Sequence, residues 1–224
     1  MDAIATAVLD LAALQISGLA LEAETLWLTS MQERLVARAA ADGSGAVAVL
    51  RFPHPVADVA PGPEGLWIVA GGGRDGRQCV LWSATEQRAL RRFDCPGGAG
   101  GGLAWGRGRL WLTHRHNRRL LVLDPSNGAV ERTITTEHEV FSPSFADGEL
   151  WLVETKTGPF GRFSPQSEAV YFFTRFDSDR EAVCERLAAP AAVAAMTTDG
   201  RRFWYAPRGE TGIACCARAE LGAA

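Results

Sequence analysis

The sequence predicts an all-β fold of five propeller blades, and three observations support this prediction. A short apolar motif centred on tryptophan recurs at steps of 40, 44, 40 and 53 residues, and a repeat of about 40–45 residues is typical of a four-stranded propeller blade. Each motif is apolar at consecutive positions, as expected of sheets covered on both faces. Turn residues separate the motifs from the segments around them. The marker residues are Trp27, Trp67, Trp111, Trp151 and Trp204.

Composition limits the function classes. The chain has 224 residues, 47% hydrophobic and 22% charged, and we predict one globular domain over residues 1–224. The net charge of −3, with acidic and basic residues interspersed, argues against nucleic-acid and membrane partners. The N-terminus lacks a basic leader and no apolar run reaches ~18–20 residues, so the sequence predicts a cytoplasmic protein. Five cysteines without a Cys-x-x-Cys pair predict reduced, packed thiols.

The first two units each contain four strand-like segments separated by turn residues. The glycine-rich stretch 95–102 follows them. It lacks the Gly-Lys-Ser/Thr ending of a phosphate-binding loop and leads into a strand, so we predict a connection between blades. The expected strands are 17–20, 26–28, 34–37 and 46–52, then 56–60, 66–70, 78–82 and 88–93.

The third unit is the most regular. Residues 119–134 read as a strand, an Asp-Pro and Asn-Gly turn, and a second strand, which predicts a hairpin. Together with the preceding Leu110-Trp111-Leu112, this stretch resembles the outer hairpin of YVTN-type and NHL-like β-propeller repeats. The resemblance implies a propeller architecture. Those families include binding modules and enzymes, so it leaves the chemistry open.

The fourth unit carries an insertion. Its expected strands cover 141–145, 150–153 and 169–173. A short helix is expected near residues 178–188, because Ser178 and Glu181 have the spacing of a capping box and Pro190 would end the helix.

The fifth unit supplies only three strands, at 193–197, 203–205 and 212–218. We therefore expect an N-terminal strand at residues 3–10 to pair with 212–218 and close the ring, which would leave no open sheet edge there. A β-sandwich is the alternative fold. It leaves the regular step unexplained, and its half-solvated strands would alternate in polarity.

One end of the predicted ring collects the polar candidates. The loops that enter the first strands and the loops that join second to third strands emerge together there, and all four histidines fall in these loops. His114, His116 and His138 form the candidate metal set, for a divalent transition metal. The alternative is that they are solvated loop residues.

Arginines and acids at this end are candidates for binding a small ligand. Arginine pairs with carboxylate or phosphate through two parallel hydrogen bonds, and a pair of acids could act as in five-bladed glycosidases. Arg74, Arg115, Arg118, Arg180 and Arg208 are the arginine candidates. The predicted ligand-binding set is Arg115, Arg118, Glu137, Glu139, Glu154 and Arg208.

No complete catalytic motif is present. Cys184 has no base near it in sequence, and we expect Cys215 and Cys216 to pack on opposite faces of a strand. The sequence therefore favours a non-catalytic recognition module that binds a small polar or anionic ligand, or a partner protein, at the loop-rich end. The alternative is a metal-dependent hydrolase, lyase or isomerase that uses the histidines there.

Overall fold

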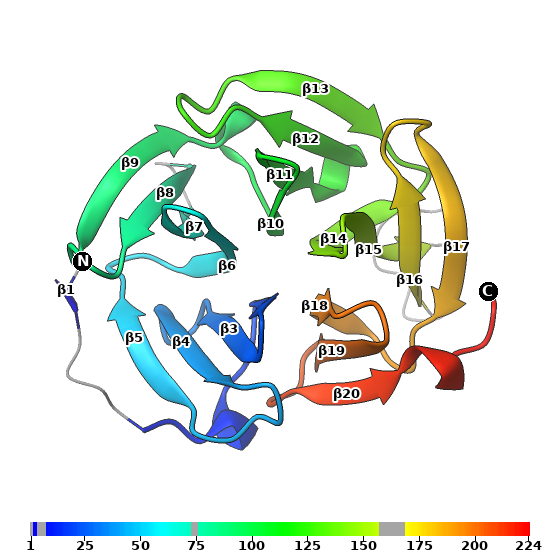
Figure 1. The fold of residues 1–224 in the computed structure, drawn as a ribbon, viewed down its shortest axis with the longest axis horizontal. Helices are drawn as coiled ribbons and strands as arrows, with labels where there is room; N and C mark the ends of the chain where they lie inside the picture. The colour runs from blue at the N-terminus through cyan, green and yellow to red at the C-terminus, as the bar shows by residue number, and fades with distance from the viewer. Residues whose placement is uncertain (1, 4–7, 73–75, 157–168) are drawn as a thin grey trace.

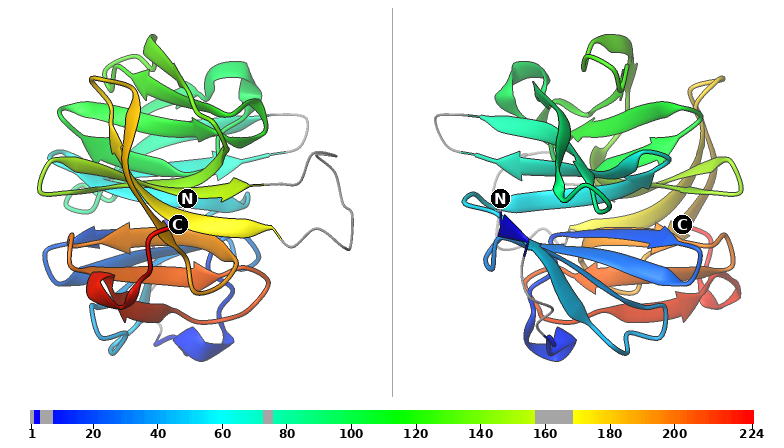
Figure 2. Two further views of the ribbon diagram at one scale, coloured as in Figure 1. Left: turned by 90° about the vertical axis from the view of Figure 1, so that its right-hand side faces the viewer. Right: turned by 60° about the vertical axis from the view of Figure 1, so that its left-hand side comes forward.

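Five antiparallel sheets surround a central axis in the computed structural model (Figure 1), which describes residues 2–3, 8–72, 76–156 and 169–224. Each sheet is built from strands that follow one another in the chain, and the connections lie at the two ends of the ring (Figure 2). The prediction of a five-bladed propeller is confirmed. Among the residues described, no helix is both long and apolar enough to cross a membrane.

The first two blades have their strands in chain order from the axis outward. The first contains β2 (Gly18–Glu22), β3 (Thr25–Ser30), β4 (Leu35–Ala40) and β5 (Val47–Arg51), with β1 (Asp2–Ala3) outside β5. The second contains β6 (Val56–Gly62), β7 (Gly65–Gly71), β8 (Arg77–Ser83) and β9 (Arg88–Asp94).

The other three blades follow the same order. The third contains β10 (Leu103–Gly106), β11 (Arg109–His114), β12 (Arg119–Leu123) and β13 (Val130–Thr135). The fourth contains β14 (Glu139–Ala146), β15 (Glu149–Lys156), β16 (Val170–Asp177) and β17 (Ala182–Ala188). The fifth contains β18 (Val193–Thr198), β19 (Arg202–Pro207) and β20 (Ala214–Ala217). Short 3-10 helices are η1 (Leu11–Ala13), η3 (Pro96–Gly98), η4 (Arg115–Asn117) and η5 (Arg218–Glu220).

Two-residue turns set the register of the inner hairpins. Ala146 of β14 pairs with Glu149 of β15, so only Asp147 and Gly148 form the turn. Their φ angles are 50° and 78°. A two-residue turn with two positive φ angles matches the right-handed twist of the flanking strands.

The marker tryptophans occupy equivalent positions, as predicted. Each lies on the second strand of its blade, opposite a small residue of the first strand, and none is more than 8% exposed. Each belongs to a different apolar cluster between its own blade and the next. Trp204, for example, packs with Leu28 and Leu35 of the first blade. The repeat therefore reflects five similar junctions between blades.

Hydrogen bonds between neighbouring blades, close to their first strands, complete the ring around the axis. Such hydrogen bonds contribute about 1 kcal/mol each, and one is present at each of the five junctions. They join Ser17 Oγ to the Val56 carbonyl at 2.9 Å, Leu103 N to Asp58 Oδ2 at 2.7 Å, Thr113 Oγ1 to the Phe141 carbonyl at 3.4 Å, Ser144 Oγ to Thr197 Oγ1 at 3.2 Å, and Leu21 N to Thr197 Oγ1 at 2.9 Å.

The predicted ring closure by the N-terminal strand is wrong. Asp2 of β1 pairs with Arg51 of β5, and Val8 bridges Val47, so these described residues extend the outer edge of the first blade. The fifth sheet has three strands within the described part of the chain. The outer edges of the first and fifth sheets offer the same kind of unpaired backbone groups to an N-terminal strand. An alternating sequence therefore cannot tell which edge such a strand will join. The C-terminal residues also lie on an outer edge, since Ala223 bridges Leu187 of β17 (Figure 1).

The predicted helix near residues 178–188 is also wrong. Residues 182–188 form strand β17, which pairs with β16 from Asp177 to Phe172. The Asp177 carboxylate accepts hydrogen bonds from the backbone N–H groups of Asp179 and Arg180, so the apparent capping signal belongs to a turn. Tertiary pairing with β16 overrides the weak helical spacing.

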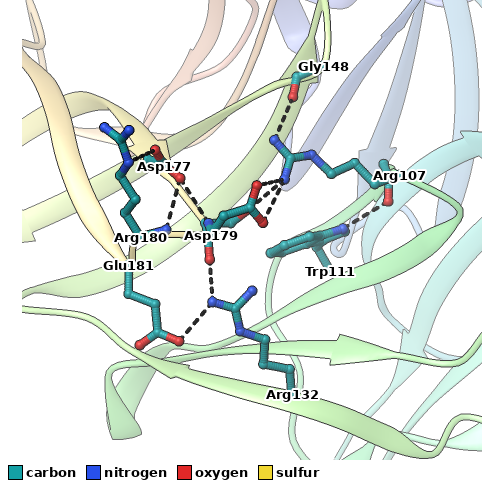
Figure 3. Close-up of polar contacts among 10 residues, drawn as sticks. Arg107, Trp111, Arg132, Gly148, Asp177, Asp179, Arg180 and Glu181 are labelled. Atoms are coloured by element: carbon teal, nitrogen blue, oxygen red, sulfur yellow. Dashed lines mark hydrogen bonds and ion pairs between the residues drawn. The ribbon is translucent and has the colours of Figure 1, made fainter.

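Arginines of the third blade hold this turn (Figure 3). Arg107 Nη1 lies 3.1 and 3.0 Å from the two carboxylate oxygens of Asp179, and Arg132 Nη2 lies 2.9 Å from Glu181 Oε1. The turn follows β16, at the end of the ring away from the loops that enter the first strands. Arg180, a sequence candidate for ligand binding, therefore lies away from the other candidates.

Candidate functional site

A pocket of about 310 Å³ opens at the axis of the propeller. Every blade contributes to it through its first strand or the residues entering that strand. Ser17, Ala57, Gly102, Phe141 and Ala194 represent the five blades in order. We call this pocket the central mouth. It lies at the end of the ring where the sequence predicts function.

Three arginines line the central mouth: Arg77, Arg115 and Arg208. All three come from the connections between second and third strands. Arg77 is the first residue of β8, Arg115 begins η4 after β11, and Arg208 follows the last residue of β19. None of the pocket-lining residues in the described part of the chain is acidic. The local charge is therefore positive, although the whole chain is acidic.

Phe141 holds two of these arginines together. The guanidinium carbons of Arg115 and Arg208 lie 4.3 and 5.2 Å from the centroid of its ring, and such cation–π contacts stabilise a desolvated cation. Arg208 Nη1 also donates to the hydroxyl of Tyr171 at 2.7 Å. Glu139 Oε2 lies 3.4 Å from Arg115 Nε.

Burial and mutual repulsion disfavour the positive charges of the mouth arginines. Burial lowers the pKa of Arg115, and the positive charges of Arg208 and Arg77 lower it further, while Glu139 opposes them. Burial also lowers the pKa of Arg77. Despite the nearby Glu139, Arg115 Nε is buried without a hydrogen-bond partner among the residues described. A buried unsatisfied donor costs about 1–3 kcal/mol.

A second hollow of about 360 Å³ adjoins the mouth, since both are lined by Arg77, Gly101 and Arg115. Its remaining lining includes His114. The Nε2 atom of His114 lies 2.9 Å from the carbonyl oxygen of Pro96 and 3.1 Å from that of Ala99. This nitrogen must therefore carry the proton and donate it.

The arrangement does not support the predicted metal set. Asn117 Nδ2 donates to His114 Nδ1 at 3.1 Å, so both nitrogens of His114 are occupied. His116 is exposed, and His138 stacks on Phe172 with 6.0 Å between ring centroids. Within the described ranges, no three His, Cys, Asp or Glu side chains gather in a way that could hold a metal ion.

Two of the predicted ligand-binding acids are engaged in an ion pair on the fourth blade. Glu154 is 1% exposed, accepts a hydrogen bond from Thr174 Oγ1 at 2.7 Å, and lies 3.1 Å from Arg186 Nη2. Glu137 Oε2 lies 3.1 Å from the same nitrogen. The exposed Arg118 donates to the Glu137 carbonyl at 3.5 Å. These contacts stabilise the packing of the blade and do not line the central mouth.

The structure thus brings Arg115 and Arg208 of the predicted set to the mouth, and Glu139 lies behind Arg115 without lining the pocket. Sequence reasoning missed Arg77, because it does not share the offset of the other two arginines. Arg115 and Arg208 each stand four residues after a marker tryptophan, whereas Arg77 stands ten residues after Trp67. Nothing in the sequence marks Phe141 as a site residue beyond its place on an inner strand. Arg74 lies outside the described residues.

Comparison with known proteins supports the fold alone. No family model and no curated protein matches the chain. Among solved structures, glutaminyl cyclase of Myxococcus xanthus is 12% identical, with 96% of each chain covered and a TM-score of 0.66. Virginiamycin B lyase from Staphylococcus aureus is 13% identical, with 98% of this chain and 88% of that chain covered and a TM-score of 0.55.

A nidogen/laminin complex matches at 14% identity, covering 93% of this chain and 78% of that chain, with a TM-score of 0.57. The chain is a β-propeller protein, in agreement with its resemblance to YVTN-type and NHL-like repeats. Propellers are commonly binding or recognition scaffolds, but at these identities no activity transfers from one protein to another.

Proposed function

We propose that this propeller is a recognition module that binds a small anion, a carboxylate or a phosphate, in the central mouth. The observation that carries the proposal is the convergence of Arg77, Arg115 and Arg208 around an acid-free lining. Arginine guanidinium groups recognise both kinds of anion through paired hydrogen bonds. A volume of about 310 Å³ is that of a small-molecule pocket, which favours a small ligand over a partner protein.

Binding is favoured over catalysis. The solved structures that share the fold include proteins titled a cyclase and a lyase, and we carry neither activity to this chain. The mouth lining, as far as the chain is described, offers guanidinium and hydroxyl groups without a carboxylate or a histidine. General acid–base chemistry uses such groups, whereas anion binding does not need them.

Titration calorimetry at low ionic strength tests the proposal, with inorganic phosphate and citrate as the two probes. Arg208→Ala should lower the affinity for the better probe by about tenfold or more, because hydrogen bonds to charged groups contribute roughly 1.5–3 kcal/mol. Arg180→Ala is the matched control, since that side chain is 85% exposed on the β16–β17 turn. Absence of binding to both probes, or unchanged affinity in Arg208→Ala, would contradict the proposal.

A further inference from the structure

Two buried cysteines face each other beside the central mouth. Cys79 lies in the middle of β8, and Cys95 follows the last residue of β9. Their Sγ atoms are 3.5 Å apart, and the two residues are 0% and 2% exposed. The backbone N–H of Cys95 donates to the Arg77 carbonyl at 2.8 Å, so the end of this pair of strands is held together at the cysteines.

We propose that Cys79 and Cys95 are a dithiol that a small-molecule disulfide oxidises to an intrachain disulfide. The thiolate of Cys95 attacks one sulfur of the reagent, forms a mixed disulfide and releases one reagent thiolate. The thiolate of Cys79 then attacks Cys95 Sγ and releases the second. The two electrons pass from the protein to the reagent, and the two thiol protons go to the released thiolates through solvent.

The bond requires movement of one sulfur toward the other. A disulfide has its sulfurs about 2.05 Å apart, which is less than the present 3.5 Å. Cys79 is fixed, since β8 pairs with β7 on one side and β9 on the other. Cys95 begins the glycine-rich connection 95–102, where glycines permit backbone changes that other residues resist. We therefore expect Cys95 and this connection to move.

The connection 95–102 accepts hydrogen bonds from two side chains at or beside the central mouth. The carbonyl groups of Pro96 and Ala99 accept from His114 Nε2, and the carbonyl of Gly100 accepts from Arg77. A shift that starts at Cys95 therefore reaches Arg77 in the central mouth. An effect of oxidation on anion binding rests on the proposed function, whereas formation of the disulfide does not.

The reaction should be slow at neutral pH. The hydrogen bond with Cys95 raises the pKa of the Cys79 thiol, and burial raises it further. Since the thiolate is the attacking species, the second step should accelerate as the pH rises. Access of the reagent to Cys95 requires opening of the connection 95–102.

The test uses the full chain with Cys184→Ser, Cys215→Ser and Cys216→Ser, which leaves only the two buried cysteines. The folded variant is incubated with bis(2-hydroxyethyl) disulfide and examined by intact mass and peptide mapping. The expected product is a linked Cys79–Cys95 peptide and a loss of two hydrogens. Peptide mapping of the wild-type chain, where exposed thiols report that the reagent is active, should show the same link.

Adding Cys95→Ser to this background is the matched control and should abolish the link. Free thiols or mixed disulfides at both positions, under conditions that fully modify exposed Cys184, would overturn the proposal. Anion affinity of the oxidised protein is then measured with the better of phosphate and citrate, and we expect it to fall several-fold. A disulfide that forms without this change would reject the link to the mouth and leave the dithiol assignment standing.

Discussion

The indole N–H of Trp204 donates a hydrogen bond of 2.7 Å to the carbonyl of Ala41. Trp204 belongs to the last blade and Ala41 follows the third strand of the first, so this bond crosses the junction at which the ring closes. No described strand is shared between these two blades. Closure therefore depends on contacts such as this one, the bond from Leu21 N to Thr197 Oγ1, and the backbone bond from Gly212 N to the Leu14 carbonyl.

Removing the Trp204 contact should weaken the closure. Trp204→Ala should cost about 3–5 kcal/mol through loss of packing, and Trp204→Phe about 1–2 kcal/mol because the Ala41 carbonyl loses its partner. Urea unfolding measures both. Trp111→Phe is the control, since that indole bonds Gly106 within its own blade. Hydrogen exchange near both chain ends should increase in the Trp204 variants only, and equal exchange in all variants would contradict this role.

The blade repeat could be predicted because it is local. Each marker tryptophan stands in a strand buried on both faces, and burial of that kind leaves an apolar run in the sequence. The closure could not be predicted, because the unpaired edges of β5 and β20 offer the same backbone groups to an N-terminal strand. In residues 182–188, Val183 is 41% exposed and Leu187 is 5% exposed. Their spacing fits a helix, and only the pairing with β16 decides otherwise.

The site was predictable in part for a related reason. Arg115 and Arg208 share one offset from a marker tryptophan, so the repeat itself places them at one end of the ring. The fates of Glu154 and His114 depend on partners distant in sequence. Glu154 forms an ion pair with Arg186 on β17, and His114 donates to carbonyl groups of the connection 95–102. No local pattern records these contacts.

Gly18 should be irreplaceable at the axis. A Cβ atom on Gly18 would lie 2.6 Å from the backbone Cα of Asp58 and 2.1 Å from Asp58 Oδ1. Gly18→Ala forces the first two blades apart and should cost about 3 kcal/mol or more, as measured by urea unfolding. Gly222→Ala is the matched control, since a Cβ there would meet no atom within 4 Å. Similar stability in the two variants would show that the inner strands can separate without cost.

Asp58 should make stability fall as the pH rises. Burial raises the pKa of its carboxyl group well above the usual range, although hydrogen bonds from the N–H groups of Leu103 and Val59 lower it in part. A carboxyl group whose pKa is higher in the folded protein than in the unfolded chain stabilises the fold. This contribution is fully present below the unfolded pKa of about 3.9. It is lost as the pH rises through the folded pKa.

Asp58→Asn isolates this effect, because asparagine does not titrate. The amide nitrogen would face a backbone N–H donor, so the variant should be less stable than the wild type near pH 4. The difference in unfolding free energy between the two proteins should then shrink as the pH approaches 8. Urea unfolding across this range measures it, and a difference that widens with pH would show that Asp58 is held as a carboxylate.

Glu139 should restrain anion binding at the central mouth. Its Oε2 atom lies 3.4 Å from Arg115 Nε, and its side chain is 19% exposed, so its charge competes with an incoming anion for that guanidinium. Glu139→Gln removes the charge while keeping the shape of the side chain. At an effective dielectric constant of ~20, two charges ~8 Å apart repel by roughly 2 kcal/mol, so removing this charge should strengthen phosphate or citrate binding by about tenfold or more.

Calorimetry with the better of the two probes measures this gain, and the gain should shrink as salt screens the charges. Glu131→Gln is the matched control. Glu131 pairs with Arg109 on the third blade and belongs to β13, the strand farthest from the axis in that blade, so its loss should leave affinity unchanged. Weaker binding in Glu139→Gln would mean that Glu139 orients Arg115 for the ligand. The guanidinium would then need its carboxylate partner in the bound state, and the competition between Glu139 and the anion would be disproved.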